Sequence, residues 1–401
     1  MDFDLTPEQR EIKRAAKEFA RGEFDPAKAM EYELGHLFPF DLYRKAGELG
    51  FIGMDVPEQF GGAGLGVMEN VLVIEEFCKR DSGIGMALHL AQLPAKIIKI
   101  CGTEDQKRRY LTPLTRGEYI SAVSFTEPDH GSDLTSMNAR ASEVPDGYLI
   151  NGTKLFTTNG AYADFFVVLA QHDEPGQPSP GTSTFIVPRD EAALTAGNME
   201  INELPHKMGL RMTSSAEIVF RDLKIPKENL LGPKGRGLQN ILDFFNESRI
   251  EIAAQALGCA QGSFLKALKY ARERKQFNTP LVDFQAIGHK LSRMLGNLNA
   301  CRLSVYHAAW ACQYHGKRLS ALTPLLTSTV KYYVPEHAKE VLDQAINVLG
   351  GYGYFLEQEL ERRYRDSRIT EIYEGTVEVQ LNNVTRLLKK FNPEYIDEML
   401  F

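Results

Sequence analysis

The segment Ile372-Tyr373-Glu374-Gly375-Thr376 decides both the fold and the chemistry expected of this chain. Gly375 allows the backbone to turn tightly beside Glu374, so the carboxylate can face an apolar cavity instead of water. A carboxyl group in such a cavity has a raised pKa, which suits a general base that removes a weakly acidic proton. From this segment alone, an ordinary glutamate in a surface turn is an equally good interpretation.

A second segment, Thr126-Glu127-Pro128-Asp129-His130-Gly131-Ser132-Asp133, follows a β-prone run. Its hydroxyls and its backbone N–H groups suit hydrogen bonding to the ring or the phosphates of a cofactor. A loop of this composition is weak evidence when it stands alone. The distance between the two segments, and the pattern of elements between them, make the pair informative.

Together the two segments resemble the acyl-CoA dehydrogenase family, whose members use FAD to oxidise a thioester between its α and β carbons. The resemblance covers nearly the whole chain. It implies a mostly α fold with a central β domain, in three parts. These parts are an N-terminal helical domain over residues 1–117, a middle β-barrel domain over residues 118–232 and a C-terminal helical bundle over residues 233–401.

Local patterns favour the same order of helices, strands and helices. Thr6, Pro7 and Gln9 form a capping-box signal for a first helix, and apolar periodicity predicts one helix over Gly85–Ile100. Asn151-Gly152 between two β-prone runs predicts a type I′ hairpin turn. The Pro-rich stretch Asp173–Gly181 predicts an exposed loop. Long helices are expected over Leu238–Lys275, Phe284–His315 and Leu322–Val348, with a last one over Val377–Phe391.

Composition and spacing exclude several other classes. The net charge is −7 and the basic residues are scattered, which argues against a nucleic-acid partner. No apolar run approaches the roughly 18 residues needed to cross a bilayer, so no integral membrane contact is expected. The five cysteines are widely spaced and no secretory or transit segment starts the chain, which favours the cytoplasm. No metal-ligand spacing, P-loop, Gly-x-Ser-x-Gly elbow or dinucleotide fingerprint occurs, so metal and NAD are disfavoured.

The resemblance implies that Glu374 is the catalytic base and that Arg249 supports its loop or the substrate. An ordinary helix ion pair is the alternative for Arg249. In some members of the family the base stands instead at the position of Ser248, and serine cannot serve. Glu247 is the nearest carboxylate there, but one residue along a helix rotates the side chain by about 100°, which should direct it elsewhere.

Cofactor and substrate contacts are likewise implied by the resemblance. Phe156 would lie against the isoalloxazine ring, unless it is a buried strand aromatic. The other predicted FAD contacts on the same chain are Phe125, Thr126, Ser132, Thr158 and Thr376. A further group, Arg274, Gln276, Phe277, Asn347 and Gly351, would reach the FAD of a neighbouring subunit, which implies a homo-oligomer, expected to be a homotetramer. The predicted substrate contacts are Ser132, Phe245, Asn246, Arg249, Tyr373 and Gly375.

The acyl group is not determined. The family sets chain length with a helix that here contains Met86, Leu88, His89, Leu90 and Gln92, the expected pocket floor. His89 and Gln92 would make that floor polar, which leaves branched, alicyclic and aromatic acyl groups open. Ile84 stands where glutaryl-CoA dehydrogenases carry arginine, so a dicarboxylate is disfavoured.

An electron-transfer flavoprotein is the expected electron acceptor, by family alone. Two alternatives remain: an acyl-CoA oxidase of the same fold that reduces oxygen, and a catalytically silent scaffold.

Overall fold

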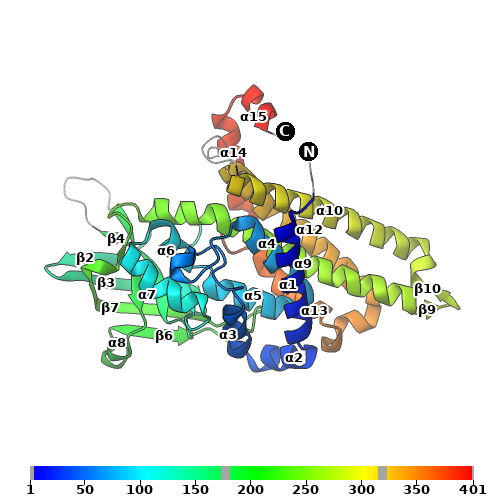
Figure 1. Ribbon diagram of the computed structural model, residues 1–401, viewed down its shortest axis with the longest axis horizontal. Helices are drawn as coiled ribbons and strands as arrows, with labels where there is room; N and C mark the ends of the chain where they lie inside the picture. Colours follow the sequence, from blue (N-terminus) through cyan, green and yellow to red (C-terminus); the bar gives the residue numbers. More distant parts are fainter. Residues whose placement is uncertain (1–3, 173–180, 315–322, 400–401) are drawn as a thin grey trace.

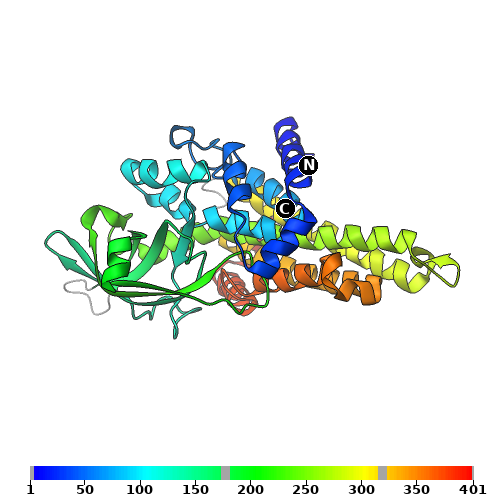
Figure 2. The ribbon, with the colours of Figure 1, turned by 90° about the horizontal axis from the view of Figure 1, so that it is seen from below.

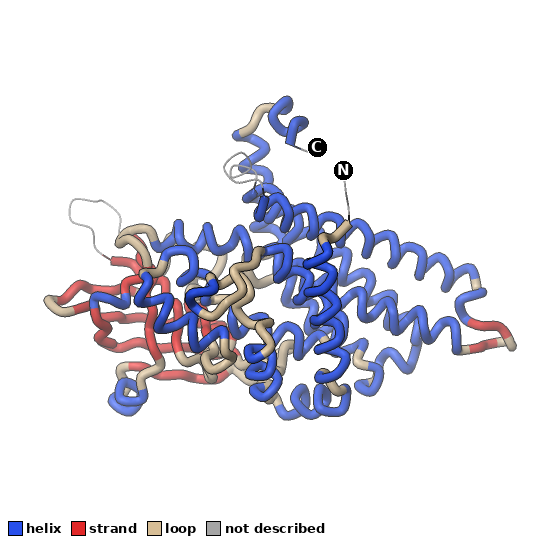
Figure 3. Tube along the Cα trace, in the orientation of Figure 1, coloured by secondary structure: helices blue, strands red, loops and turns tan. Residues whose placement is uncertain are grey.

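The structure, a computed structural model, describes residues 4–172, 181–314 and 323–399. Helices form most of the molecule, and the large β-sheet lies at one end of its long axis (Figures 1 and 3). This order of a helical part, a β part and a helical bundle confirms the predicted fold class. The N-terminal helices are α1 (Pro7–Glu23), α2 (Pro26–Gly35), α3 (Phe40–Glu48), α4 (Val67–Arg80), α5 (Ser82–Gln92), α6 (Ala95–Cys101) and α7 (Glu104–Thr115), with a 3-10 turn η1 (Glu58–Phe60).

The predicted capping box at the start of α1 is present. The Thr6 hydroxyl accepts a hydrogen bond from the Gln9 backbone at 3.1 Å, and the Gln9 side chain accepts one from the Thr6 backbone at 3.1 Å. Pro7 occupies the first helical turn, where its missing N–H removes no helical bond.

The single helix predicted over Gly85–Ile100 is wrong, because the chain breaks into α5 and α6 at Leu93-Pro94. Pro94 has no N–H to continue the helical ladder. By length and hydropathy, Ser82–Cys101 would suffice to span a membrane, contrary to the expectation that no segment came close. However, 78% of its apolar window is buried inside the protein, as in a core helix.

The middle part is an eight-stranded sheet in the order β6-β7-β3-β2-β4-β5-β8, with β1 paired in parallel to β4. Strand β4 is buried on both faces. Its residues Phe165, Val167 and Leu169 pack into the main helical core, whereas Phe166 and Val168 pack into a second core within the β part. The elements are β1 (Ser121–Ser124), β2 (Arg140–Val144), β3 (Gly147–Thr158), β4 (Phe165–His172), β5 (Gly181–Pro188), α8 (Glu191–Ala196), β6 (Met199–Glu203), β7 (Ser215–Pro226), η2 (Lys227–Asn229) and β8 (Leu230–Leu231).

The hairpin turn predicted at Asn151-Gly152 is wrong. Strand β3 runs through both residues, and Gly152, at φ 138°, lies at an irregularity in its pairing with β7. A Cβ on Gly152 would meet the backbone of Ala139 at 2.6 Å, so close packing explains this glycine. The turn lies earlier, between the paired residues Val144 and Gly147. The loop predicted from Asp173 falls outside the described residues as far as 180, and Gly181 already begins β5.

A bundle of long helices forms the C-terminal part (Figure 2). Its elements are α9 (Gly237–Glu273), β9 (Lys275–Gln276), β10 (Thr279–Pro280), η3 (Leu281–Asp283), α10 (Gln285–Tyr314), α12 (Thr323–Leu349), η4 (Gly350–Tyr354), η5 (Leu356–Gln358), α13 (Leu360–Ser367), η6 (Arg368–Glu371), α14 (Val377–Lys390) and α15 (Pro393–Met399). The 37-residue α9 packs against α4, α10 and α12, so it connects the N-terminal helices to the bundle.

Replacement of Phe165 by alanine should destabilise the whole protein. Its ring is fully buried and packs 4.9 Å from that of Tyr110, so truncation leaves a cavity that costs about 3–5 kcal/mol. Thermal and urea unfolding measure the loss. Leu34→Ala, at a side chain 57% exposed, is the control and should shift stability by less than about 0.5 kcal/mol. Equal losses in the two variants would contradict the two-core arrangement.

Candidate active site

The segment between η6 and α14 forms a tight loop with two consecutive residues in the left-handed region. Glu374 has φ 59° and Gly375 has φ 93°. This conformation is natural for glycine but costs an ordinary residue about 1–2 kcal/mol, so other contacts must stabilise Glu374 in it. Thr376 ends the loop as the N-cap of α14, where its hydroxyl accepts from the Val379 backbone at 3.3 Å.

Three side chains from three helices supply those contacts by donating to loop carbonyls. Arg249 on α9 donates to the Glu374 carbonyl at 3.3 Å. Gln380 on α14 donates to the carbonyls of Glu374 and Gly375 at 3.1 and 3.2 Å. Lys331 on α12 donates to the Gly375 carbonyl at 3.2 Å. The predicted support of this loop by Arg249 is therefore present.

Residue Glu374 is half-buried, and its carboxylate is oriented by α9. The hydroxyl of the buried Ser248 donates to its Oε2 at 2.6 Å. Burial raises the pKa of the Glu374 carboxyl, while the Ser248 hydrogen bond and the charges of Arg249 and Lys331 act to lower it. The net direction is upward, as the sequence predicted.

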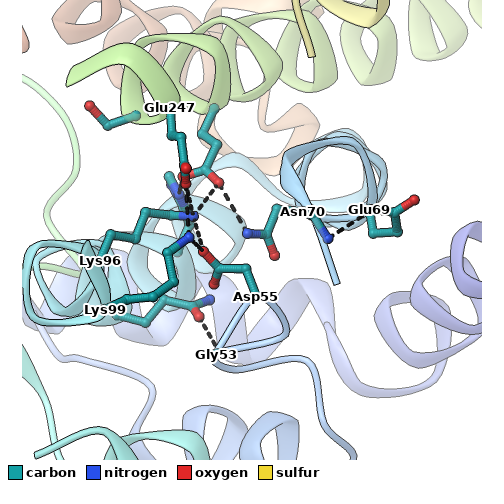
Figure 4. A network of polar contacts seen from close by, with 12 residues as sticks. Gly53, Asp55, Glu69, Asn70, Lys96, Lys99 and Glu247 are labelled. Atoms are coloured by element: carbon teal, nitrogen blue, oxygen red, sulfur yellow. Dashed lines mark hydrogen bonds and ion pairs between the residues drawn. The ribbon is translucent and has the colours of Figure 1, made fainter. Parts of the chain in front are cut away.

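Glu247 points away from this loop, as its position on the helix predicted. Its carboxylate pairs with Lys99 at 3.0 Å and with Lys96 at 3.5 Å, both on α6 (Figure 4). Asp55 pairs with the same two lysines, at 2.6 Å to Lys96 and 2.5 Å to Lys99. Glu247 is therefore committed to an ion-pair network outside the loop.

This network continues inside the protein to the residue beside Glu374. Lys96 also pairs with Glu251 at 2.9 Å, and Glu251 contacts His89 at 3.0 Å. The other ring nitrogen of His89 lies 2.6 Å from the Gln255 side-chain nitrogen. The side-chain oxygen of Gln255 accepts a hydrogen bond from the Tyr373 hydroxyl. Ser248, Glu251 and Gln255 thus share one stripe of α9, at the spacing i, i+3, i+7.

The expectation that His89 and Gln92 give polarity to an acyl pocket is not supported by their contacts. His89 contacts Glu251 and Gln255, and the Gln92 side chain accepts a hydrogen bond from the Gly53 backbone at 2.5 Å. The neighbouring Met86 and Leu88 belong to the buried core. The enclosed space beside this network is about 20 Å³, roughly the room for one water molecule.

The residues predicted to contact FAD on the same chain lie together where β1 ends beside the last residues of β3, except Ser132 and Thr376. The Leu155 backbone donates to the Thr126 carbonyl at 2.8 Å, which places Phe125 and Thr126 beside Phe156. Phe156 is 65% exposed at φ 55°, so the buried interpretation of this aromatic is wrong. An exposed ring here fits stacking by a planar group. Ser132 lies exposed farther along the loop.

A buried ion pair fixes the base of that loop. Lys154 on β3 donates to Glu127 at 2.8 Å, and both side chains are almost fully buried. Glu127 also accepts from the Ala139 backbone at 2.9 Å. These bonds join the loop to β3 and to the chain entering β2.

The second predicted cofactor group lies at the far end of the bundle, around the β9–β10 hairpin (Figure 1). A groove of about 710 Å³ is lined there by Arg274, Gln276, Asn347 and Gly351, together with the aromatic Tyr352. The ring of Phe277 is 90% exposed at the hairpin. The first predicted cofactor group therefore lies in the β part, whereas the second lies at the end of the bundle remote from the sheet.

Of the remaining predicted substrate contacts, Phe245 and Asn246 lie partly exposed on α9 one turn before Arg249. The Arg249 guanidinium lies over the Phe245 ring, 4.9 Å from its centre. This contact joins the two residues through the α9 surface that faces the Glu374 loop.

Sequence reasoning missed Ser248 as a hydrogen-bond donor, and it missed Lys331 and Gln380. A signal did exist for Lys331, because it falls on the buried stripe of α12 with Thr327, Val334 and Ala338. A lysine on an apolar stripe predicts a buried ammonium with specific acceptors.

Comparison with known families identifies the chain. It matches the profiles of the acyl-CoA dehydrogenase N-terminal domain over residues 6–118, the middle domain over residues 122–223 and the C-terminal domain over residues 235–389. The chain belongs to the acyl-CoA dehydrogenase family. As a member of it, the protein is an oxidoreductase that acts on acyl-CoA thioesters.

Two relatives and two solved structures of acyl-CoA dehydrogenase fold are similar over nearly their whole length. The short-chain specific acyl-CoA dehydrogenase of Clostridium acetobutylicum is 37% identical, over 95% of this chain and 97% of that protein. The NADH-dependent acryloyl-CoA reductase of Anaerotignum propionicum is 35% identical, over 97% and 96%. Butyryl-CoA dehydrogenase from Megasphaera elsdenii superimposes with a TM-score of 0.89 at 33% identity, over 97% and 100%. A chain from the structure of the electron transferring flavoprotein of Acidaminococcus fermentans superimposes with a TM-score of 0.89 at 36% identity, over 98% of this chain and 100% of that chain.

Replacement of Ser248 by alanine should raise the pKa of Glu374 by about one to two pH units. The lost hydrogen bond stabilises the ionised carboxylate, so the proton is retained to higher pH. The carboxyl stretch in infrared spectra, assigned by its loss in Glu374→Gln, measures the titration. Ser248→Thr keeps the hydroxyl and should titrate like the unmodified protein. An unchanged pKa in Ser248→Ala would remove Ser248 from the site.

Proposed function

We propose that the protein removes the α-proton of an acyl-CoA thioester with the Glu374 carboxylate and forms the 2-enoyl-CoA. The observation that carries the proposal is the geometry of this carboxylate, which Ser248 orients at 2.6 Å on a loop held by Arg249, Lys331 and Gln380, and the upward direction of its pKa agrees with it. Such a group binds a proton more strongly than an exposed glutamate does, and general-base catalysis of this kind contributes about 10²–10⁴ in rate.

FAD is the cofactor implied by the family. When bound, it supplies the hydride acceptor at N5 for the hydrogen that leaves the β carbon. The exposed Phe156 and its neighbours Thr126 and Thr158 would hold the isoalloxazine end. The residues of this chain orient the thioester, take up the α-proton at Glu374 and hold the base loop.

A homotetramer would bring the two cofactor groups together. A groove at the end of the bundle remote from the β-sheet is lined by Arg274, Gln276, Asn347 and Gly351, whereas Phe156 is on β3 of that sheet, so a second copy would have to supply them to the same FAD. A guanidinium beside phosphate or adenine is electrostatically favourable. Support for this assembly is the groove that already gathers four of the five predicted residues.

A short acyl group is the substrate class we propose. Glu251 stands one helical turn, about 4.5 Å, beyond Ser248 on α9. It is paired with Lys96 and His89, which hold the pKa of its carboxyl below the ordinary value against the effect of burial. An apolar tail extending toward this network would have to displace charges. The similar butyryl-CoA and short-chain dehydrogenases support the same choice.

An electron-transfer flavoprotein is the acceptor we propose, on the strength of the similar chain from the Acidaminococcus fermentans structure. Because acryloyl-CoA reductase is also similar, the physiological direction of the reaction needs its own test. Admitting oxygen to the reduced protein identifies an oxidase by the rapid return of the flavin absorbance. Comparing the rate of flavin reduction by acyl-CoA with the rate of reoxidation by enoyl-CoA shows which direction is favoured.

Replacement of Glu374 by glutamine should leave flavin bound but abolish its bleaching by substrate, with a rate loss of about 10²-fold or more. Anaerobic visible spectra, recorded with straight, branched and cyclic acyl-CoA thioesters, measure this. Glu247→Gln is the matched control, since Glu247 pairs with α6, and it should bleach normally. Retained bleaching in Glu374→Gln would move the base to another group. Absence of flavin after FAD addition would instead favour a scaffold.

Replacement of Arg274 by glutamine should weaken FAD retention more than it slows the chemical step, because Arg274 lines the distal groove and lies far from Glu374. FAD release during dialysis, followed by flavin fluorescence, measures retention. Arg272→Gln, at an exposed arginine two residues earlier that does not line the groove, is the control. If both variants keep FAD equally well, the assignment of this groove fails.

A further inference from the structure

Lys331 carries a positive charge that the proposed chemistry does not use. Its side chain is fully buried on α12, between Thr327 and Val334 on the stripe that faces α9 and the Glu374 loop. A buried ammonium is strongly unfavourable unless its protons meet acceptors. A lysine in this position therefore needs a structural or functional reason.

Its acceptors lie at the two ends of the base loop. The ammonium donates to the Thr370 carbonyl at 2.6 Å and to the Gly375 carbonyl at 3.2 Å. Among the salt bridges of the described residues, none includes Lys331, so its charge is not neutralised by direct contact with a carboxylate. One side chain thus links the last turn before the loop to the left-handed Gly375 that follows Glu374.

We propose that Lys331 is a positioning residue for the base: it fixes the loop through these two carbonyls and stabilises the ionised form of Glu374 by its charge. This inference rests on the proposed role of Glu374. A small displacement of a catalytic group can cost about 10² in rate, so fixing the loop has a measurable value.

Several charged groups face Glu374 and Lys331 from the elements packed against them. Arg249 and Glu251 lie on α9 and Glu371 lies in η6, whereas Gln380 on α14 is neutral. Arg249 and Lys331 both favour the ionised carboxylate, and Glu251 opposes it. Burial lowers the pKa of Lys331 to about 7, so the ammonium carries its charge below that pH. Loss of this cation should therefore raise the pKa of Glu374.

The experiment compares Lys331→Met with Lys339→Met in the flavin-loaded protein. Lys339 lies two turns later on the same helix and pairs with Glu371 at 2.7 Å, but its side chain is 41% exposed. Lys331→Met should slow anaerobic bleaching by about 10- to 100-fold, with unchanged flavin content. The acid limb of its pH–rate profile, where the bleaching rate falls at low pH, should shift upward by about one pH unit. Lys339→Met should change neither the bleaching rate nor the acid limb.

A purely structural role would lower the melting temperature of Lys331→Met without moving the acid limb, and that result overturns the proposal. So does an equal shift in Lys339→Met. If Lys331→Met does not fold, Lys331→Gln retains a donor without the charge, and it should show the same shift of the limb with a smaller loss of rate.

The infrared titration of Glu374 in the Lys331 variants separates this inference from the proposed function, because it needs no turnover. An unchanged pKa of Glu374 overturns the inference even in an active enzyme. A raised pKa supports it even if no thioester bleaches the wild-type flavin, an outcome that would reject the proposed function alone.

Discussion

The hydrogen bond from Ser248 to Glu374 is the contact on which the site depends, because it joins the longest helix to a loop whose conformation is otherwise unfavourable. A glutamate in the left-handed region does not stay there through local preference. Glu374 is held in this conformation by the Ser248 bond together with the donors to the carbonyls of Glu374 and Gly375. The candidate base is therefore defined by tertiary contacts far more than by its own segment.

Helix α9 supplies two sets of contacts. Ser248 and Arg249 meet the loop, while Glu251 and Gln255 belong to the internal network that runs through His89 to the lysines of α6. Buried ion pairs of this kind contribute little net stability, because removing charges from water offsets their attraction. Their effect here is to fix the positions of the side chains, since each residue of the network contacts at least one other.

The sequence predicted the Thr6 cap from local pattern and the three-part fold from motifs of a few adjacent residues. The raised pKa of Glu374 is one of two interpretations of its segment, because burial of the carboxylate depends on tertiary contacts. It could not predict the break at Pro94 with certainty, since prolines also occur within helices, as Pro335 does in α12. It misplaced a turn at Gly152, where the glycine is explained instead by close packing against the Ala139 backbone. Lys331 and Ser248 reach partners 39 and 126 residues away, and no periodicity encodes such pairings.

The three carbonyl donors to the base loop stand on α9, α12 and α14, and the last of these, Gln380, follows the loop in the chain. During synthesis the loop leaves the ribosome before Gln380 does, and long after α9. No nascent chain that lacks α14 can hold Glu374 in its left-handed geometry with all three donors. A chain that ends before α14 therefore carries Glu374 without the full set of contacts that hold its loop.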